Sequence, residues 1–133
     1  MKAFSLSVVT PDGLQFEGQV TSLLVHTDQG DLEFLAGHVD YIASIGTGRA
    51  RIITEGGTKT ASCSGGFVTV SGGEIRLVCV TFEFRDQIDL NRARRAHEEA
   101  EQKLAAAIDE RSIQMARAKM SRALARIKVA ENR

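Results

Sequence analysis

Three arginines in the last third of the sequence have the type and spacing to bind phosphate groups. Arg92 lies one helical turn after Asp89, and Arg122 and Arg126 are four residues apart, so they share a helix face. In an antiparallel helical hairpin the start of one helix approaches the end of the other, which brings the three guanidiniums together. Guanidiniums bind phosphate oxygens with paired hydrogen bonds, so this arrangement suits a triphosphate. The small Ala93 leaves room for a base or a sugar.

These residues also have a purely structural explanation. Asp89 has the properties of a helix N-terminal cap, whose carboxylate accepts hydrogen bonds from free backbone N–H groups. The arginines can instead contact other proteins or pair with the acidic residues of the first helix, which are Glu98, Glu99 and Glu101. Spacing alone does not separate the two interpretations, and both stay open at this point.

The sequence after residue 88 has the periodicity of two amphipathic helices. We expect Asp89 to cap the first helix and Ser112 to cap the second, after a break at 108–111. The pattern predicts a C-terminal antiparallel two-helix hairpin over 88–133. The expected apolar stripes are Leu90, Ala93, Ala96, Ala100, Leu104 and Ala107 in the first helix, and Ile113, Ala116, Met120, Ala123 and Ile127 in the second.

Both stripes are rich in alanine, which lets helices approach closely but buries little apolar area. Burial stabilises by about 25 cal/mol per Å², and truncating a buried leucine to alanine costs about 2–5 kcal/mol. An alanine seam is therefore expected to hold the hairpin less firmly than a leucine seam. One interpretation is a hairpin that folds yet detaches, and the other is a permanently packed pair of good helix formers.

Residues 1–84 have the pattern of short β-strands. Apolar and polar residues alternate in short runs, and turn sequences recur about every eight to twelve residues. The pattern predicts an N-terminal antiparallel flattened β sandwich or barrel of about ten short strands, because each sheet must hide one apolar face. The less regular segment 36–41 is expected to be an exposed loop.

The net charge of zero hides an uneven distribution. Residues 1–86 carry 6 basic and 10 acidic side chains, whereas residues 112–133 carry 6 basic and 1 acidic. A basic helix suits an acidic protein surface or phosphate groups. No apolar run approaches the ~20 residues of a membrane span, and the first residues lack the pattern of a signal peptide. We expect a chain in the cytosol with no direct membrane span.

Cysteines and histidines show no spacing typical of catalysis or metal binding. Cys63 and Cys79 lie in strand-like runs and are expected to be buried free thiols. Together with His26, His38 and His97 they form no known nucleophile or metal pattern, and the Gly-rich turns lack the strand-to-helix context of a phosphate loop. We therefore expect no catalytic centre and no metal.

Several short motifs occur in an order that resembles one known family, the ε subunit of the rotary F-type ATP synthase, the counterpart of the mitochondrial δ subunit. Each motif is weak alone, but together they cover essentially the whole chain. They are Thr10-Pro11, Phe16-Glu17-Gly18-Gln19-Val20, Gly30-Asp31-Leu32 followed by Gly37-His38, Gly65-Gly66-Phe67, and Ile88-Asp89-x-x-Arg92-Ala93.

The resemblance implies a non-catalytic subunit of the central rotor stalk, peripheral on the cytoplasmic face of the membrane. The β-sandwich domain, 1–84, would bind the γ subunit and the ring of c subunits, and the hairpin, 88–133, would regulate ATP hydrolysis in the α/β catalytic head. The implied partner-binding residues are Gly30, Asp31, His38, Arg117, Lys119, Arg122, Arg126 and Lys128.

Some members of this family bind ATP on the folded hairpin as a regulatory ligand. The matching positions here are Glu83, Ile88, Asp89, Arg92, Ala93, Arg122 and Arg126. Nucleotide-binding members tend to carry a further basic residue in the body of the first helix, where this chain has Glu98 and Glu99. Arg95 or Lys103 are the residues expected to compensate.

A different class of function is a free-standing adaptor whose basic helix binds RNA or an acidic protein. One Tyr and no Trp argue against base stacking on the helices. The acidic β half argues against an extended electrostatic footprint for nucleic acid. We therefore expect no nucleic-acid partner.

Overall fold

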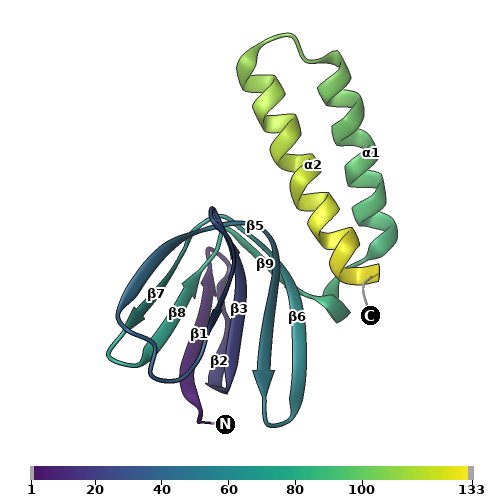
Figure 1. Ribbon diagram of the computed structural model, residues 1–133. Helices are drawn as coiled ribbons and strands as arrows, with labels where there is room; N and C mark the ends of the chain where they lie inside the picture. The colour runs from purple at the N-terminus through teal and green to yellow at the C-terminus, as the bar shows by residue number, and fades with distance from the viewer. Residues whose placement is uncertain (1, 132–133) are drawn as a thin grey trace.

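The computed structural model describes residues 2–131, which form nine β-strands followed by two α-helices (Figure 1). The strands are β1 (Phe4–Thr10), β2 (Gly13–Val20), β3 (Ser22–Thr27), β4 (Gly30–Phe34), β5 (Tyr41–Thr54), β6 (Gly57–Ser64), β7 (Phe67–Ser71), β8 (Glu74–Val78) and β9 (Thr81–Phe84). A 3-10 turn, η1 (Arg85–Gln87), leads to the helices α1 (Leu90–Ala106) and α2 (Glu110–Glu131).

The strands form two sheets that share β5. Sheet A has the order β2-β1-β8-β7 and continues into the first residues of β5, Tyr41 to Ser44. Sheet B contains β4, β3, the rest of β5, β6 and β9. The two sheets pack face to face as a sandwich, which confirms the predicted fold class.

Two glycines of β5 lie just after the point where this strand passes from sheet A to sheet B. A Cβ atom on Gly48 would lie 2.9 Å from the Cβ of His26, and one on Gly46 would lie 3.0 Å from its Cδ2. The His26 side chain therefore packs against β5 at two positions that lack a side chain. Its Nδ1 is 3.0 Å from Oδ1 of Asp31 in β4.

The core lies between the sheets and comes from alternate residues of each strand. In β1, Phe4, Leu6 and Val8 are buried while the residues between them are half-buried. Leu77 of β8 and Phe34 of β4 are fully buried in the same cluster. This alternation is the signal from which the strands were predicted.

Two details of the β half differ from the sequence prediction. The described chain has nine strands rather than about ten, and β5 is one strand of 14 residues that runs through Gly46 and Gly48. The β1/β8 pair is parallel, whereas only antiparallel pairs were expected. No local turn joins these strands, so the path of the chain between the sheets sets their direction.

The two helices form the expected antiparallel hairpin with an alanine seam. Ala93 and Ala100 of α1 and Ala116 and Ala123 of α2 are buried, and the other residues of the two predicted stripes are half-buried. Ala125 and Val129 are also buried, although they lie outside the predicted stripe. They lie in the C-terminal part of α2, the helix that contacts β5 and β6.

The predicted cap of α1 is confirmed, whereas the predicted cap of α2 is wrong. Asp89 caps α1, since its Oδ1 accepts a hydrogen bond from the backbone N–H of Arg92 at 3.1 Å. Helix α2 begins at Glu110, so Ser112 lies in its first turn and Asp109 precedes the helix. Hydrogen bonds from the hydroxyl and backbone of Ser112 lower the pKa of Asp109. A negative charge at this position also interacts favourably with the positive end of the helix.

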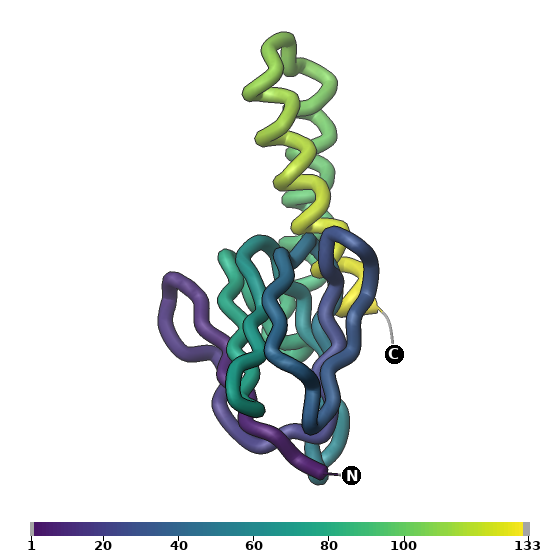
Figure 2. The backbone as a smooth tube through the Cα atoms, turned by 60° about the vertical axis from the view of Figure 1, so that its left-hand side comes forward, coloured from purple at the N-terminus to yellow at the C-terminus, as the bar shows by residue number. Residues whose placement is uncertain are grey.

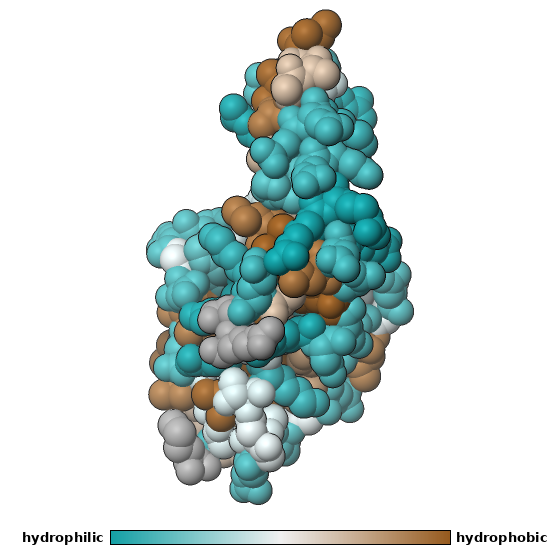
Figure 3. All heavy atoms as spheres, turned by 90° about the vertical axis from the view of Figure 1, so that its right-hand side faces the viewer, coloured by the Kyte–Doolittle hydropathy of each residue, from teal (hydrophilic) through white to brown (hydrophobic). Residues whose placement is uncertain are grey.

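The hairpin projects from one end of the sandwich (Figures 1 and 2). Its base lies beside η1 and the ends of the strands, and its turn points away from the sandwich. The face of the hairpin seen in Figure 3 is mostly hydrophilic, with apolar atoms at the tip. Ile108 in the turn is 96% exposed. Within residues 2–131, no helix is both long enough and apolar enough to span a membrane.

Candidate functional site

The segment between the sandwich and α1 places two acidic residues next to the hairpin base. Glu83 lies in β9 opposite Ser62 of β6. At η1, the side chain of Gln87 accepts a hydrogen bond from the backbone N–H of Phe84 at 3.0 Å, which fixes the turn. The chain then enters α1 through Ile88 and the cap residue Asp89.

An ion pair joins the end of α2 to the sandwich. The Nε of Arg126 donates to Oε1 of Glu83 at 3.1 Å, and the two side chains are 31% and 36% exposed. Between the described strands and the hairpin this is the one ion pair shorter than 4.0 Å. In residues 2–131 no acceptor is bonded to the terminal nitrogens of Arg126, so they are available to an anion.

Six of the seven predicted nucleotide-binding residues line one cavity at this junction. The cavity has a volume of about 270 Å³ and lies between β9, the start of α1 and the end of α2. Its lining residues are Glu83, Gln87, Ile88, Asp89, Arg92, Ala93, Ala96 and Arg126. The cavity is thus lined by hydrogen-bond acceptors and apolar atoms at the end nearest the sandwich, and by the guanidiniums of Arg92 and Arg126 on the side of the hairpin.

The seventh residue, Arg122, lines an adjoining cavity of about 160 Å³. The two cavities share Ala96 and Arg126, so they adjoin one another between α1 and α2, and the pair is called the groove below. The further lining residues of the second cavity are Glu99, Ala100, Lys103 and Lys119. The sequence motif did not include Gln87, Ala96 or Glu99. Ala96 and Glu99 could have been predicted, because they lie four and seven residues after Arg92 and so share its face of α1.

The basic residues of α2 divide between two sides of the helix. At 3.6 residues per turn, Lys119, Arg122 and Arg126 fall on one side, and Arg117 and Lys128 fall on the opposite side. The first three line the groove, whereas Arg117 and Lys128 are exposed and line neither of its cavities. The predicted basic residues of α2 therefore form two separate surfaces, one lining the groove and one on the opposite side of the helix.

The remaining predicted partner residues lie in the sandwich, at opposite ends of β4. Gly30 begins β4 with a φ of 107°, and Asp31 contacts His26 at 3.0 Å and Arg49 at 3.8 Å. His38 lies in the loop after β4, its ring 4.9 Å from Phe34 and 5.7 Å from Tyr41. The structure does not bring Gly30 and Asp31 together with His38.

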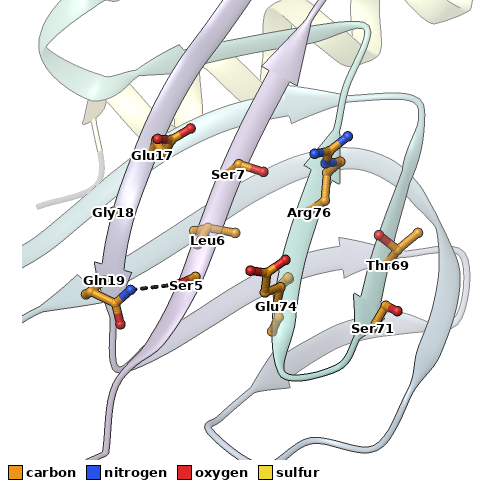
Figure 4. Close-up of a pocket in the computed structure, with 11 residues that line it drawn as sticks. Ser5, Leu6, Ser7, Glu17, Gly18, Gln19, Thr69, Ser71, Glu74 and Arg76 are labelled. Atoms are coloured by element: carbon orange, nitrogen blue, oxygen red, sulfur yellow. Dashed lines mark hydrogen bonds between the residues drawn. The ribbon is translucent and has the colours of Figure 1, made fainter.

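A wide, shallow hollow lies on the outer face of sheet A (Figure 4). Its side chains come from four neighbouring strands and spread over the sheet surface, and Gln19 donates to Ser5 at 2.7 Å. Thr69, which lines the hollow, pairs with Ile42, so the side chain of Ile42, 68% exposed, lies on the same face. Phe67, 41% exposed, shares this face because it is two residues from Thr69. A broad face of this kind suits a protein partner better than a small ligand.

The two cysteines are buried free thiols in the sandwich core, as the sequence predicted. A hydrogen bond with Cys79, together with burial, raises the pKa of Cys63. The thiol of Cys63 is therefore held in its neutral form, which is typical of a structural cysteine rather than a reactive one.

The fold and the groove define a two-part protein, a β sandwich with a helical hairpin and a cation-lined, ligand-sized site where the two meet. Family models match both parts. The β-sandwich domain of the ATP synthase Delta/Epsilon chain matches residues 3–85, and its long α-helix domain matches residues 86–131. The chain belongs to the Delta/Epsilon chain family of ATP synthase.

Individual relatives are similar over the whole chain. The ATP synthase epsilon chain of Shouchella clausii is 36% identical and covers 100% of this chain and 98% of its own length. That of Bacillus velezensis is 33% identical, with 99% of this chain and 100% of the relative covered.

Two solved structures support the fold alone. A chain of the Euglena gracilis mitochondrial ATP synthase has a TM-score of 0.80 at 23% identity, over 92% of this chain and 78% of that one. A chain of the Tetrahymena thermophila central stalk and c-ring has a TM-score of 0.63 at 14% identity, over 95% of each chain.

Proposed function

We propose that this protein is the non-catalytic central-stalk subunit of an F-type ATP synthase and couples the catalytic head to the c-ring on the cytoplasmic face of the membrane. Membership of the Delta/Epsilon chain family over residues 3–131 carries this proposal. Both structural neighbours come from ATP synthase assemblies that include the c-ring. The γ subunit, the c-ring and the α/β head are the partners that follow.

The outer face of sheet A is the surface we assign to a protein partner in the stalk. It combines exposed apolar side chains, Ile42 and Phe67, with small polar side chains such as Ser5 and Thr69. An apolar patch with a polar surround is typical of protein interfaces. Co-purification tests the assignment: the wild type should travel with γ and c subunits, and Ile42→Asp should separate from γ. A protein purified from its own cells without either subunit would instead be a free-standing adaptor.

The hairpin is proposed to bind ATP as a regulatory ligand. The observation that carries this proposal is the cavity at the hairpin base, which gathers Glu83, Ile88, Asp89, Arg92, Ala93 and Arg126. Its volume of about 270 Å³, together with about 160 Å³ in the adjoining cavity, is in the ~300–1,000 Å³ range of ligand sites.

Charge complementarity sets the orientation of the nucleotide. The cavity at the sandwich end offers Ile88 and Ala93 for apolar contact and the carboxylates of Glu83 and Asp89 as acceptors, which suit a base and a ribose. Arg126 lines both cavities and Arg122 lines the second one, so the phosphates point along the groove toward the hairpin tip.

Binding in this groove stabilises the folded hairpin because its residues come from both helices and from β9. A ligand that binds only the folded form adds RT ln(1 + [L]/Kd), or about 2.7 kcal/mol at a concentration 100-fold above Kd. That is sufficient to bias a hairpin with an alanine seam. High ATP then keeps the hairpin folded, and low ATP releases it to inhibit hydrolysis in the catalytic head.

Isothermal titration of the full chain with ATP tests this role. We expect saturable heat for the wild type and a large loss of affinity for Arg92→Ala and Arg126→Ala. Absence of heat for the wild type at millimolar ATP would reject the regulatory ligand and leave a subunit with a constitutive coupling role.

A further inference from the structure

The second cavity of the groove holds charged residues that the nucleotide motif does not contain. Lys103 of α1 and Lys119 of α2 both line it, together with Arg122, Arg126 and one acidic residue, Glu99. Four cations and one carboxylate therefore surround about 160 Å³ of space. This excess of positive charge attracts anions along the groove.

These side chains are not neutralised by one another in the structure. Within residues 2–131, no ion pair shorter than 4.0 Å includes Lys103, Lys119, Arg122 or Glu99. Arg122 is half-buried, and the other three are exposed at the rim. The cavity is thus a set of free cations with a free carboxylate among them.

The phase of α1 decides which acidic residue enters the groove. Arg92, Ala96, Glu99 and Lys103 follow one another at spacings of four, three and four residues, so they share one face of α1. Glu98 lies about 100° further around the helix and lines neither cavity. The two neighbouring glutamates therefore have different surroundings.

We infer that Lys103, Lys119 and Arg122 form a subsite for the distal phosphates of a nucleoside triphosphate, and that Glu99 within it lowers the affinity for that ligand. The inference rests on the proposed ATP role of the groove. Glu99 repels the phosphate chain while the lysines attract it. The site is consequently half-occupied at a higher triphosphate concentration than the same site without Glu99 would be.

The expected size of the effect follows from Coulomb's law. A unit charge about 6 Å from another in water-like surroundings changes a binding constant about threefold, and a terminal phosphate with nearly two charges raises this to about tenfold. Replacing Glu99 by glutamine should therefore tighten ATP binding about tenfold. The gain should be smaller with ADP, whose terminal phosphate lies further from Glu99, and absent with adenosine.

The test is calorimetric titration of the full chain with ATP, ADP and adenosine in a buffer of low ionic strength. Glu99→Gln is compared with Glu98→Gln, which removes the same charge from the next residue outside the groove. Lys103→Gln and Lys119→Gln are compared with Lys128→Gln, which removes a lysine on the opposite side of α2. Circular dichroism checks that each variant keeps the helical content of the wild type.

The expected result is a gain for Glu99→Gln, losses of about three- to tenfold for Lys103→Gln and Lys119→Gln, and no change for Glu98→Gln or Lys128→Gln. If the wild type binds ATP and Glu99→Gln behaves like Glu98→Gln, the subsite is rejected while the proposed ATP role stands. If neither the wild type nor Glu99→Gln binds at millimolar ATP, both are rejected. Binding by Glu99→Gln alone supports the subsite.

Discussion

Replacement of Arg126 by alanine separates the structural and the ligand-binding roles of the hairpin base. Arg126 holds Glu83 at 3.1 Å and also lines both cavities of the groove. Its ion pair is about one-third exposed on each side, and pairs of this kind contribute about 0.2–1 kcal/mol. The substitution should therefore lower the free energy of unfolding of the hairpin by no more than about 1 kcal/mol.

The effect of the same substitution on ATP binding should be larger. A hydrogen bond to a charged group contributes about 1.5–3 kcal/mol, which corresponds to a loss of affinity of about 10- to 150-fold. Glu83→Gln removes the same ion pair but keeps the guanidinium, so it should give a similar loss of stability and a much smaller loss of affinity. Arg117→Ala, on the opposite side of α2, should change neither quantity.

Two measurements read these effects independently. Urea unfolding followed by far-ultraviolet circular dichroism gives the stability of the helices, and calorimetric titration gives the affinity for ATP. Wild-type affinity in Arg126→Ala would refute the placement of the phosphates in the groove. A stability loss several times the expected value would show that Arg126 is mainly a structural residue.

Three further predictions concern the cap, a glycine and the buried thiols. Asp89→Ala should destabilise α1 by about 1 kcal/mol because it removes the cap, whereas Asp89→Asn should keep most of that stability. Urea unfolding compares the two variants, and equal stabilities would contradict the capping role of Asp89. Gly66→Ala should lower the free energy of unfolding by at least about 3 kcal/mol, because Gly66 has a φ of 96° and an added Cβ would overlap the carbonyl oxygen of Val78. Gly72 has a φ of 57°, but an added Cβ there would have no atom within 4 Å. Gly72→Ala should therefore lower the free energy of unfolding by only about 1–2 kcal/mol, and thermal unfolding compares the two variants. The raised pKa of Cys63 means that the folded state keeps a proton which the unfolded state releases, so stability should be constant below the ordinary pKa of 9.0 and fall as pH rises above it. Cys63→Ala should lack this contribution, and a wild-type stability that does not change above pH 9.0 would contradict it.

The sequence predicted the parts of the fold that depend on local patterns. Alternation in β1 predicted a strand with one buried face, and the three- and four-residue spacing after Asp89 predicted a helix with its cap. The parallel pairing of β1 with β8 was not predicted, because residues far apart in the chain determine it. The passage of β5 between the sheets was also not predicted. Gly46 and Gly48 have the composition of a turn, and only the structure shows that they lie within a strand and pack against His26.

The candidate site was predicted in part. The antiparallel hairpin predicted that the guanidiniums of Arg92, Arg122 and Arg126 converge. The structure places Arg92 and Arg126 around one cavity and Arg122 in the adjoining one. The role of the acidic pair in α1 was left open in the sequence, because adjacent residues differ in direction by about 100° and only the packed hairpin shows which of them enters the groove. The structure places Glu99 there and leaves Glu98 outside.

We propose that ATP binds the folded hairpin and keeps it folded. Amide hydrogen exchange of the full chain, measured with and without ATP, reads this directly. At a concentration 100-fold above Kd, exchange should be about 100-fold slower across α1 and α2, with little change in the sandwich. Saturating ATP that leaves the exchange of both helices unchanged would contradict it.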